Sequence, residues 1–373
     1  MPSQETPQQT NAVSPATALR QMIFNCGIPQ LIYVVAKLGI ADILKDGPKR
    51  CDELATAVGA DPEALYRVLR ALASVDVFAE VDHGSFRLTP IAALLQADAP
   101  GSWRATALMH GEWYWRPFGA LLHSVQTGMP GFEHVFDMAF YDYLAHHADA
   151  AEVFNANMTA GTTQAARAVA AAYDFSGITT LVDVGGGQGA LIAGLLQTNP
   201  QMRGILFDLP SGLEGARSLL EAEGVAERCA LVAGDFLVSV PDGGDAYLLK
   251  YILIDWDDAH AITILTNCHR AMQEQGKLLV VEMLIPPGNA PFFGKFIDIY
   301  MLMLGRGRHR TEAEYRTLFA AAGFKLTQII PTQSPTHFSI IEGVRAWPKG
   351  REEWTSGRTS PPLWARSAAV QRG

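Results

Sequence analysis

The sequence predicts an α/β protein in which a winged-helix-like, mainly helical N-terminal domain precedes a Rossmann-like, doubly wound sheet. From Thr179 onward, apolar strand-like segments alternate with helical stretches, as in a sheet that carries helices on both faces. The first of these strands leads into the glycine-rich turn 185–189, and glycines allow the sharp bend that such folds need at this point. Between residues 51 and 90 the predicted order is helix, helix, hairpin, the order of a winged helix.

The bulk properties indicate a soluble cytoplasmic protein with more than one structural unit. A chain of 373 residues exceeds a single compact core, and 49% hydrophobic with 18% charged residues is typical of globular proteins. We recognise no secretory signal and no apolar run long enough to cross a membrane. The four cysteines are far apart and contain no CxxC pair, which fits a reducing compartment. We divide the chain into a disordered N-terminus (1–14), the winged-helix-like domain (15–100), a helical linker and pocket region (101–175), the α/β domain (176–345) and a loose C-terminal tail (346–373).

The N-terminal domain is predicted from local signals. Residues 29–45 are apolar at helical spacing, and residues 51–59 open and close a short helix. Asp61 is a typical N-cap, followed by Pro62 at the first helical position. Strand-like segments at 77–81 and 86–89 flank a turn and complete the hairpin.

A winged helix suggests DNA binding, but the charges favour another role. Seven acidic residues and three arginines lie between Cys51 and Pro90, and the whole chain carries a formal net charge of -9. Such a surface is poorly suited to phosphate backbones. We therefore predict a dimerisation module, a homodimer and no nucleic-acid partner.

The region 96–175 is helical and rich in aromatic residues. Aromatic side chains at this density form either core or the wall of a substrate pocket. Both interpretations remain open.

Seven strands are then predicted in the α/β domain: 180–184, 203–207, 229–233, 246–250, 277–282, 325–331 and 338–342.

The glycine turn alone does not identify a cofactor. Gly185, Gly187 and Ala190 also satisfy the nicotinamide fingerprint, and Asp208, 19 residues beyond Gly189, could accept ribose hydroxyls of either cofactor. Residues at the ends of the later strands distinguish between the possible cofactors. An acidic residue followed by an aromatic one, as in Asp235-Phe236, can bind the adenine amino group and cover the ring.

The ordered series VDVGGGQG, FDLP, GDF and LKYILIDWDD resembles the S-adenosylmethionine-dependent O-methyltransferases of the plant caffeic-acid and acetylserotonin type and their bacterial relatives in polyketide tailoring. The similarity spans roughly residues 17–345. It implies a methyltransferase sheet, an N-terminal dimerisation domain, S-adenosyl-L-methionine as cofactor and a small aromatic or polyketide-like acceptor, methylated at oxygen.

The resemblance also implies site residues. Gly185, Gly187 and Gly189 of the turn would hold the methionine portion of the cofactor. Asp208 and Leu209 at the end of the second strand would bind its ribose, and Asp235 and Phe236 at the end of the third would contact its adenine. Lys250 and Trp256 would lie beside the cofactor, and Thr162 would lie near its carboxylate. Acceptor-pocket candidates, for which ordinary core or structural roles remain open, are His110, Phe154, Met158, Tyr300 and Met301.

One family position departs from the pattern. The usual motif ends in HDW, and its histidine removes the acceptor proton, but here Ile254 stands before Asp255 and Trp256. Two acidic residues usually hold that base: one matches Glu282, and His309 occupies the place of the other. We therefore take His309, Glu282 and Asp255 as catalytic candidates, with Ile254 as the position of the missing base.

Three explanations compete for this departure. His309 could be a relocated base paired with Glu282, which would raise its basicity; alternatively it is a surface residue in a basic run. The acceptor could be acidic enough to need no base. The chain could instead retain the cofactor without methyl transfer, as a cyclase, isomerase or hydroxylase-like enzyme.

Asp255, Asp257 and Asp258 could simply cap the next helix, and their surroundings lack ligand spacing for a metal.

Overall fold

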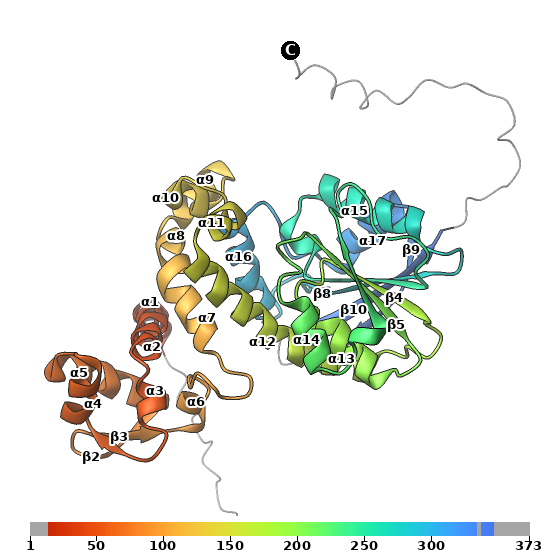
Figure 1. Cartoon of the computed structure of the whole chain (residues 1–373). Helices are drawn as coiled ribbons and strands as arrows, with labels where there is room; N and C mark the ends of the chain where they lie inside the picture. The colour runs from red at the N-terminus through yellow and green to blue at the C-terminus, as the bar shows by residue number, and fades with distance from the viewer. Residues whose placement is uncertain (1–13, 334–336, 347–373) are drawn as a thin grey trace, which may run out of the picture.

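The computed structural model describes residues 14–333 and 337–346. It shows a helical N-terminal half beside an α/β domain (Figure 1). The predicted disordered terminus at 1–14 and loose tail at 346–373 fall, apart from Ser14 and Ala346, outside the described residues. No helix in the described ranges is both long and apolar enough to cross a membrane.

The N-terminal domain has the predicted helix, helix, hairpin order. Its elements are α1 (Pro15–Phe24), η1 (Asn25–Gly27), α2 (Ile28–Lys37), α3 (Ile40–Ile43), β1 (Lys49–Arg50), α4 (Cys51–Val58), α5 (Pro62–Ala73), β2 (Phe78–Asp82), β3 (Ser85–Leu88) and α6 (Pro90–Ala93). The Asp61 side chain accepts a 2.8 Å bond from the Ala64 N–H and caps α5 as expected. The apolar helical spacing over 29–45 belongs to two helices, α2 and α3, because the chain divides at Gly39, whose φ of 67° is left-handed.

Short helices then form a region that we call the cap, made of α8–α11 and α16. The elements are α7 (Arg104–Met109), the π-helical turn η2 (His110–Tyr114), α8 (Trp115–Gly119), α9 (Leu121–Thr127), α10 (Gly131–Phe136), α11 (Phe140–His146), α12 (Ala148–Ala172) and, from much later in the chain, α16 (Gly294–Leu304). Helix α16 contacts α8, α9 and α10 (Figure 1). Buried Phe132 and Phe140 belong to the hydrophobic core of the cap, so part of the aromatic region forms core.

The α/β domain contains a seven-stranded sheet of order β6-β5-β4-β7-β8-β10-β9. The strands are β4 (Thr180–Val184), β5 (Arg203–Asp208), β6 (Cys229–Ala233), β7 (Ala246–Lys250), β8 (Lys277–Met283), β9 (Phe324–Pro331) and β10 (Phe338–Arg345). The five strands β6, β5, β4, β7 and β8 pair in parallel, and β10 is antiparallel to both neighbours. All seven predicted strands are confirmed.

Helices cover both faces of this sheet: α13 (Ala190–Thr198), α14 (Ala216–Ala222), α15 (Asp258–Ala271) and α17 (Glu312–Ala321), with the 3-10 turns η3 (Ala226–Arg228) and η4 (Leu253–Asp255). Each face has its own apolar core, and the sheet side chains alternate between the two. The strand order reverses between β4 and β7, so the crevice at their carboxyl ends is the expected ligand site.

Candidate active site

The glycine-rich turn between β4 and α13 needs glycine for two physical reasons. Gly185, Gly187 and Gly189 have φ values of 71°, 57° and 86°, which side chains disfavour. A Cβ on Gly185 would also lie 2.4 Å from the Ile252 side chain, and one on Gly189 would lie 2.8 Å from Leu206. The turn therefore keeps an open backbone face where a ligand can approach.

Asp208, at the end of β5, closes this turn from the next strand. Its Oδ2 accepts the Gly187 N–H at 2.8 Å, and its Oδ1 accepts the Leu209 N–H at 2.7 Å. Burial raises the pKa of Asp208, while both amides stabilise its charged form. Each oxygen keeps a lone pair that can accept a hydroxyl proton.

Asp183, one residue before the end of β4, carries an unsatisfied atom. Its side chain is 1% exposed, and Oδ2 has no hydrogen-bond partner among residues 14–333 and 337–346. Burial raises its pKa to about 7, although the charge of Lys250 opposes the shift. An orphaned acidic oxygen beside a glycine turn fits the ammonium group of a methionine moiety, so the residues present suit S-adenosylmethionine. Sequence reasoning did not assign Asp183, and its only signal was a lone charge in an apolar strand.

Lys250 and Thr162, predicted separately, lie in contact. The Lys250 ammonium donates a 3.0 Å bond to Thr162 Oγ1, and the Thr162 hydroxyl donates to the Met158 carbonyl at 2.7 Å. The ammonium also lies 4.9 Å from the centre of the Tyr251 ring. Burial lowers the pKa of Lys250 to about 8, opposed by the negative charge of Asp183.

An aromatic pair forms another wall of the crevice. The rings of Phe236 and Trp256 meet edge to face with centroids 5.9 Å apart. Phe236 is also 3.5 Å from the position that a Cβ on Gly185 would take. Asp235 is exposed, and its Oδ1 accepts the Leu237 N–H at 2.8 Å. Phe236, predicted at the adenine, and Trp256, predicted near the cofactor, thus lie side by side, and Phe236 also approaches the glycine turn.

Glu282 binds the backbone of the segment that carries Ile254. Its fully buried Oε1 accepts the N–H groups of Leu253 at 2.9 Å and Ile254 at 3.2 Å. The Tyr315 hydroxyl donates to Oε2. Burial raises the pKa of Glu282 to about 8, while the charge of Arg310 opposes the shift. Within the described residues Glu282 forms no hydrogen bond with His309, so the suggested pairing of these two side chains is not observed.

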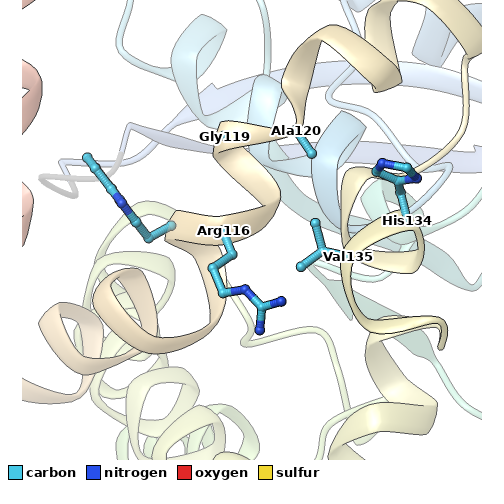
Figure 2. Close-up of a pocket in the computed structure, with 6 residues that line it drawn as sticks. Arg116, Gly119, Ala120, His134 and Val135 are labelled. Atoms are coloured by element: carbon cyan, nitrogen blue, oxygen red, sulfur yellow. The ribbon is translucent and has the colours of Figure 1, made fainter.

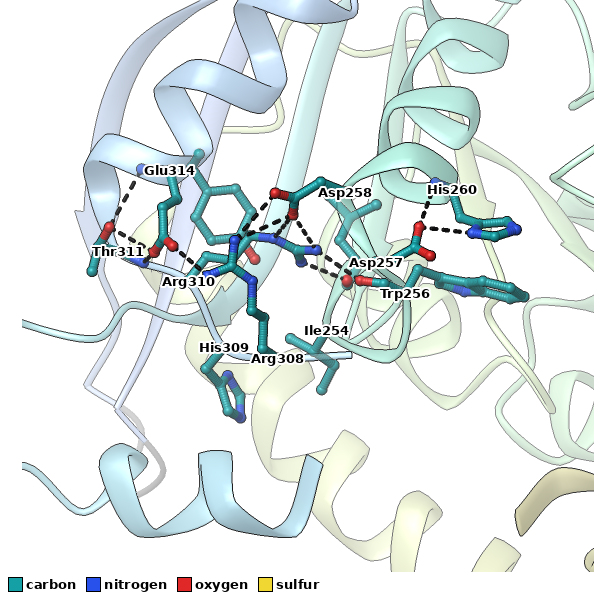
Figure 3. Close-up of polar contacts among 12 residues, drawn as sticks. Ile254, Trp256, Asp257, Asp258, His260, Arg308, His309, Arg310, Thr311 and Glu314 are labelled. Carbon is teal, nitrogen blue, oxygen red and sulfur yellow. Dashed lines mark hydrogen bonds and ion pairs between the residues drawn. The ribbon is translucent and has the colours of Figure 1, made fainter. Parts of the chain in front are cut away.

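Asp255 faces the cap. Its half-buried carboxylate accepts a 2.7 Å bond from the Tyr141 hydroxyl through Oδ2. Burial raises the pKa of Asp255 to about 6, and the bond from Tyr141 opposes the shift. The capping interpretation is wrong for Asp255, because Asp257 is the N-cap of α15. Asp258 pairs instead with Arg308 and Arg310 (Figure 3).

His309 is buried, so the expectation of a surface residue is wrong. Its side chain is 4% exposed, and its ring lies 6.1 Å from that of Tyr251. Its backbone N–H donates to Asp298 Oδ1 at 2.7 Å. Nδ1 has no partner in the described ranges. Burial lowers the pKa of His309, which keeps the imidazole neutral near pH 7.

Three acceptor candidates, His110, Tyr300 and Phe154, lie among aromatic rings of η2, α12 and the cap. His110 is 5.1 Å from Tyr300 and 5.4 Å from Tyr114, and its Nδ1 is 3.4 Å from the Tyr300 hydroxyl oxygen. Burial lowers the pKa of His110. Phe154 packs its ring edge against Phe140 and Tyr141. The sequence did not single out Tyr114 or Tyr141 from the other aromatic residues.

Two predicted pocket residues are less enclosed. Met158 is 39% exposed, so it is not core, and Met301 is half-buried on α16.

A surface pocket of about 620 Å³ lies between α8 and α10 (Figure 2). Its lining residues are Trp115, Arg116, Gly119, Ala120, His134 and Val135. None of these was predicted, and none belongs to the crevice at the glycine turn.

Comparison with known proteins agrees with this geometry. Residues 118–325 match the model of the O-methyltransferase domain, and residues 21–98 match the O-methyltransferase dimerisation domain. The chain is 47% identical to a phenazine O-methyltransferase of Lysobacter antibioticus over 90% of its own length and 97% of that protein.

Solved structures are similar over nearly the whole chain. The crystal structure of LaPhzM has a TM-score of 0.85 at 47% identity and covers 89% of this chain and 100% of its own. CalO1, a calicheamicin-biosynthesis methyltransferase solved with S-adenosylhomocysteine bound, has a TM-score of 0.79 at 35% identity and covers 90% and 100%. The glycine turn, the strand-end residues and these similarities together show that the chain belongs to the S-adenosylmethionine-dependent O-methyltransferase family.

Proposed function

We propose that the enzyme methylates a hydroxyl group on a flat, multi-ring aromatic natural product of the phenazine type. Two observations support this acceptor class. The side chains near Asp255 are aromatic rings from α11, α12 and η2, including Tyr141, Phe154 and Tyr114. The relative from Lysobacter antibioticus, 47% identical, is a phenazine O-methyltransferase.

The residues around the turn would hold the cofactor by its separate chemical groups. Asp183 and Lys250 offer opposite charges for the ammonium and carboxylate of its methionine portion, with Thr162 beside Lys250. Asp208 would accept ribose hydroxyls, and Phe236 would cover the adenine. When bound, S-adenosylmethionine supplies an electrophilic methyl group on a sulfonium.

Asp255 takes the proton in this proposal, and one observation carries it. Ile254 cannot accept a proton, whereas the next residue presents a carboxylate to the aromatic cap. With a pKa of about 6, this carboxylate is largely ionised at pH 7. Oδ2 is bonded to Tyr141, while Oδ1 forms no hydrogen bond with the described residues. As the cofactor would give up its methyl group from sulfur to the acceptor oxygen and leave as a thioether, the acceptor O–H would become strongly acidic, and the Asp255 carboxylate would accept its proton.

The family match also supports a homodimer acting on small molecules. The match over residues 21–98 is to a dimerisation domain, and α1 exposes Met22 and Phe24 to 73% and 75%. Such apolar exposure favours a protein partner. The seven acidic residues between Cys51 and Pro90 do not favour nucleic acid. We further propose the cytoplasm as the place of action.

The test uses the full chain with labelled S-adenosylmethionine and a hydroxyphenazine. Formation of one methoxyphenazine for each S-adenosylhomocysteine released is the expected result. A matched reaction uses a phenazine without the hydroxyl group and should release none. Conversion of the acceptor with no S-adenosylhomocysteine would exclude methyl transfer and favour a chemistry that retains the cofactor. Methylation at a ring nitrogen would contradict the proposed O-methylation.

A further inference from the structure

The segment 253–256 holds both Ile254 and Asp255 but has little structure of its own. It contains only the short 3-10 turn η4 between β7 and α15. A turn of this length does not fix its own position, because it makes few internal hydrogen bonds. Its backbone polar groups must therefore be bound from elsewhere.

Arg310 binds two carbonyl groups of that segment. Its side chain is 0% exposed and points at the segment (Figure 3). Nη1 donates to the Leu253 carbonyl at 2.7 Å, and Nη2 donates to the Trp256 carbonyl at 2.7 Å. Nε donates to Asp258 Oδ1 at 3.0 Å, which supplies the counter-charge. The guanidinium thus spans both ends of the segment, with Asp255 between the two carbonyls.

Glu282 binds the same segment through the opposite kind of group. It accepts the N–H groups of Leu253 and Ile254, whereas Arg310 donates to the carbonyls of Leu253 and Trp256. Both side chains are fully buried. A planar, always charged fork suits the two carbonyls, and a lysine could reach only part of this arrangement.

We infer that Arg310 is a positioning residue that sets the place of Asp255 and Trp256 in the crevice. This inference rests on the proposed role of Asp255 as the proton acceptor. Arg310 acts through the backbone, because its donors are directed at Leu253, Trp256 and Asp258. Since a displacement of about 1 Å can cost two orders of magnitude in rate, loosening this segment should act mainly on kcat.

The experiment compares Arg310→Lys with Arg308→Lys in the full chain. Arg308 is the matched control: it pairs with the same Asp258 at 3.1 Å and with Glu314, and no hydrogen bond joins it to a backbone carbonyl in the described residues. Arg310→Lys should lower kcat about 10- to 100-fold and leave both KM values within about threefold. Amide exchange in residues 253–256 should accelerate. Arg308→Lys should change neither quantity.

Hydrogen exchange separates this inference from the proposed function, because it needs no turnover. If wild type transfers no methyl group but Arg310→Lys still frees residues 253–256, the positioning role stands and the proposed reaction fails. Unchanged exchange in the folded variant overturns the positioning role, and so does a lowered melting temperature with unchanged kcat and exchange.

Should Arg310→Lys not fold, Asp258→Asn provides the second variant. This substitution removes the negative charge of the half-exposed Asp258 that pairs with Arg310, and it keeps the two hydrogen bonds from Arg310 to the backbone carbonyls. We then expect the same changes with smaller magnitude: kcat about three- to tenfold lower and faster amide exchange at 253–256. Wild-type exchange in this variant overturns the inference.

Discussion

The hydroxyl of Tyr141 donates a 2.7 Å hydrogen bond to Asp255 Oδ2, although the two residues are 114 positions apart. Tyr141 belongs to α11 of the cap, and Asp255 ends the turn after β7. This contact joins the aromatic wall to the segment where the family usually carries its base. It places an ionisable group of the catalytic domain beside the proposed acceptor surface.

Replacing Asp255 with Asn should abolish most of the methyl transfer. The amide is close in size but cannot take up the acceptor proton. We expect kcat to fall by about 10²- to 10⁴-fold, the usual contribution of a positioned base, while the affinity for S-adenosylmethionine stays near wild type. Single-turnover rates and calorimetric cofactor binding measure the two quantities.

Asp257→Asn is the control for that variant. Asp257 is the exposed N-cap of α15 and also contacts His260. Its replacement should cost at most about 1 kcal/mol in the free energy of unfolding and leave kcat unchanged. If Asp255→Asn keeps kcat within threefold of wild type, another group removes the proton or none is needed.

Tyr141→Phe should move the pH dependence in a defined direction. In wild type, kcat/KM should rise with pH around a midpoint near 6, because the ionised form of Asp255 is the active one. The bond from Tyr141 stabilises that ionised form, so its loss should raise the pKa of Asp255 and shift the midpoint upward. Tyr143→Phe on the same helix is the control, and a midpoint that stays or falls in Tyr141→Phe contradicts the assignment.

Local chemistry made much of the fold predictable. Apolar strand-like segments between helical stretches located all seven strands of the large sheet, and Asp61 with Pro62 located the start of α5. Glycines in the turn at 185–189 marked the ligand crevice because their φ values suit few other residues. The helical spacing over 29–45 does not show the break at Gly39, since the apolar residues continue across it.

The arrangement around Ile254 was far less predictable. Arg310 stands in a basic run that resembles a solvated face, yet it is fully buried because backbone carbonyls and Asp258 satisfy its donors. The partner of Asp255 comes from a distant helix that carries many aromatic residues. Neither sequence spacing nor periodicity identifies such long-range pairs, which depend on how α11 is placed against the turn after β7.

His309→Gln separates the two candidate bases. The imidazole is buried and neutral, and it packs near Tyr251 rather than against the aromatic residues beside Asp255. We therefore expect the kcat/KM midpoint to remain near pH 6 and kcat to stay within threefold of wild type. The free energy of unfolding should fall by about 1–3 kcal/mol from the loss of buried packing. His260→Gln, at an exposed histidine of α15, is the control; loss of the pH dependence in His309→Gln alone would instead identify His309 as the base.

Gly307→Ala tests how closely the chain packs behind the catalytic segment. A Cβ at Gly307 would lie 1.7 Å from the Ile254 carbonyl oxygen and 2.6 Å from Asp255 Cα, so the backbone at 254–255 must move. We expect the free energy of unfolding to fall by about 1–3 kcal/mol and kcat to fall at least tenfold. Gly305→Ala is a close control, because a Cβ there meets nothing within 4 Å. Equal kcat values for the two alanine variants would show that the position of Asp255 does not limit the reaction.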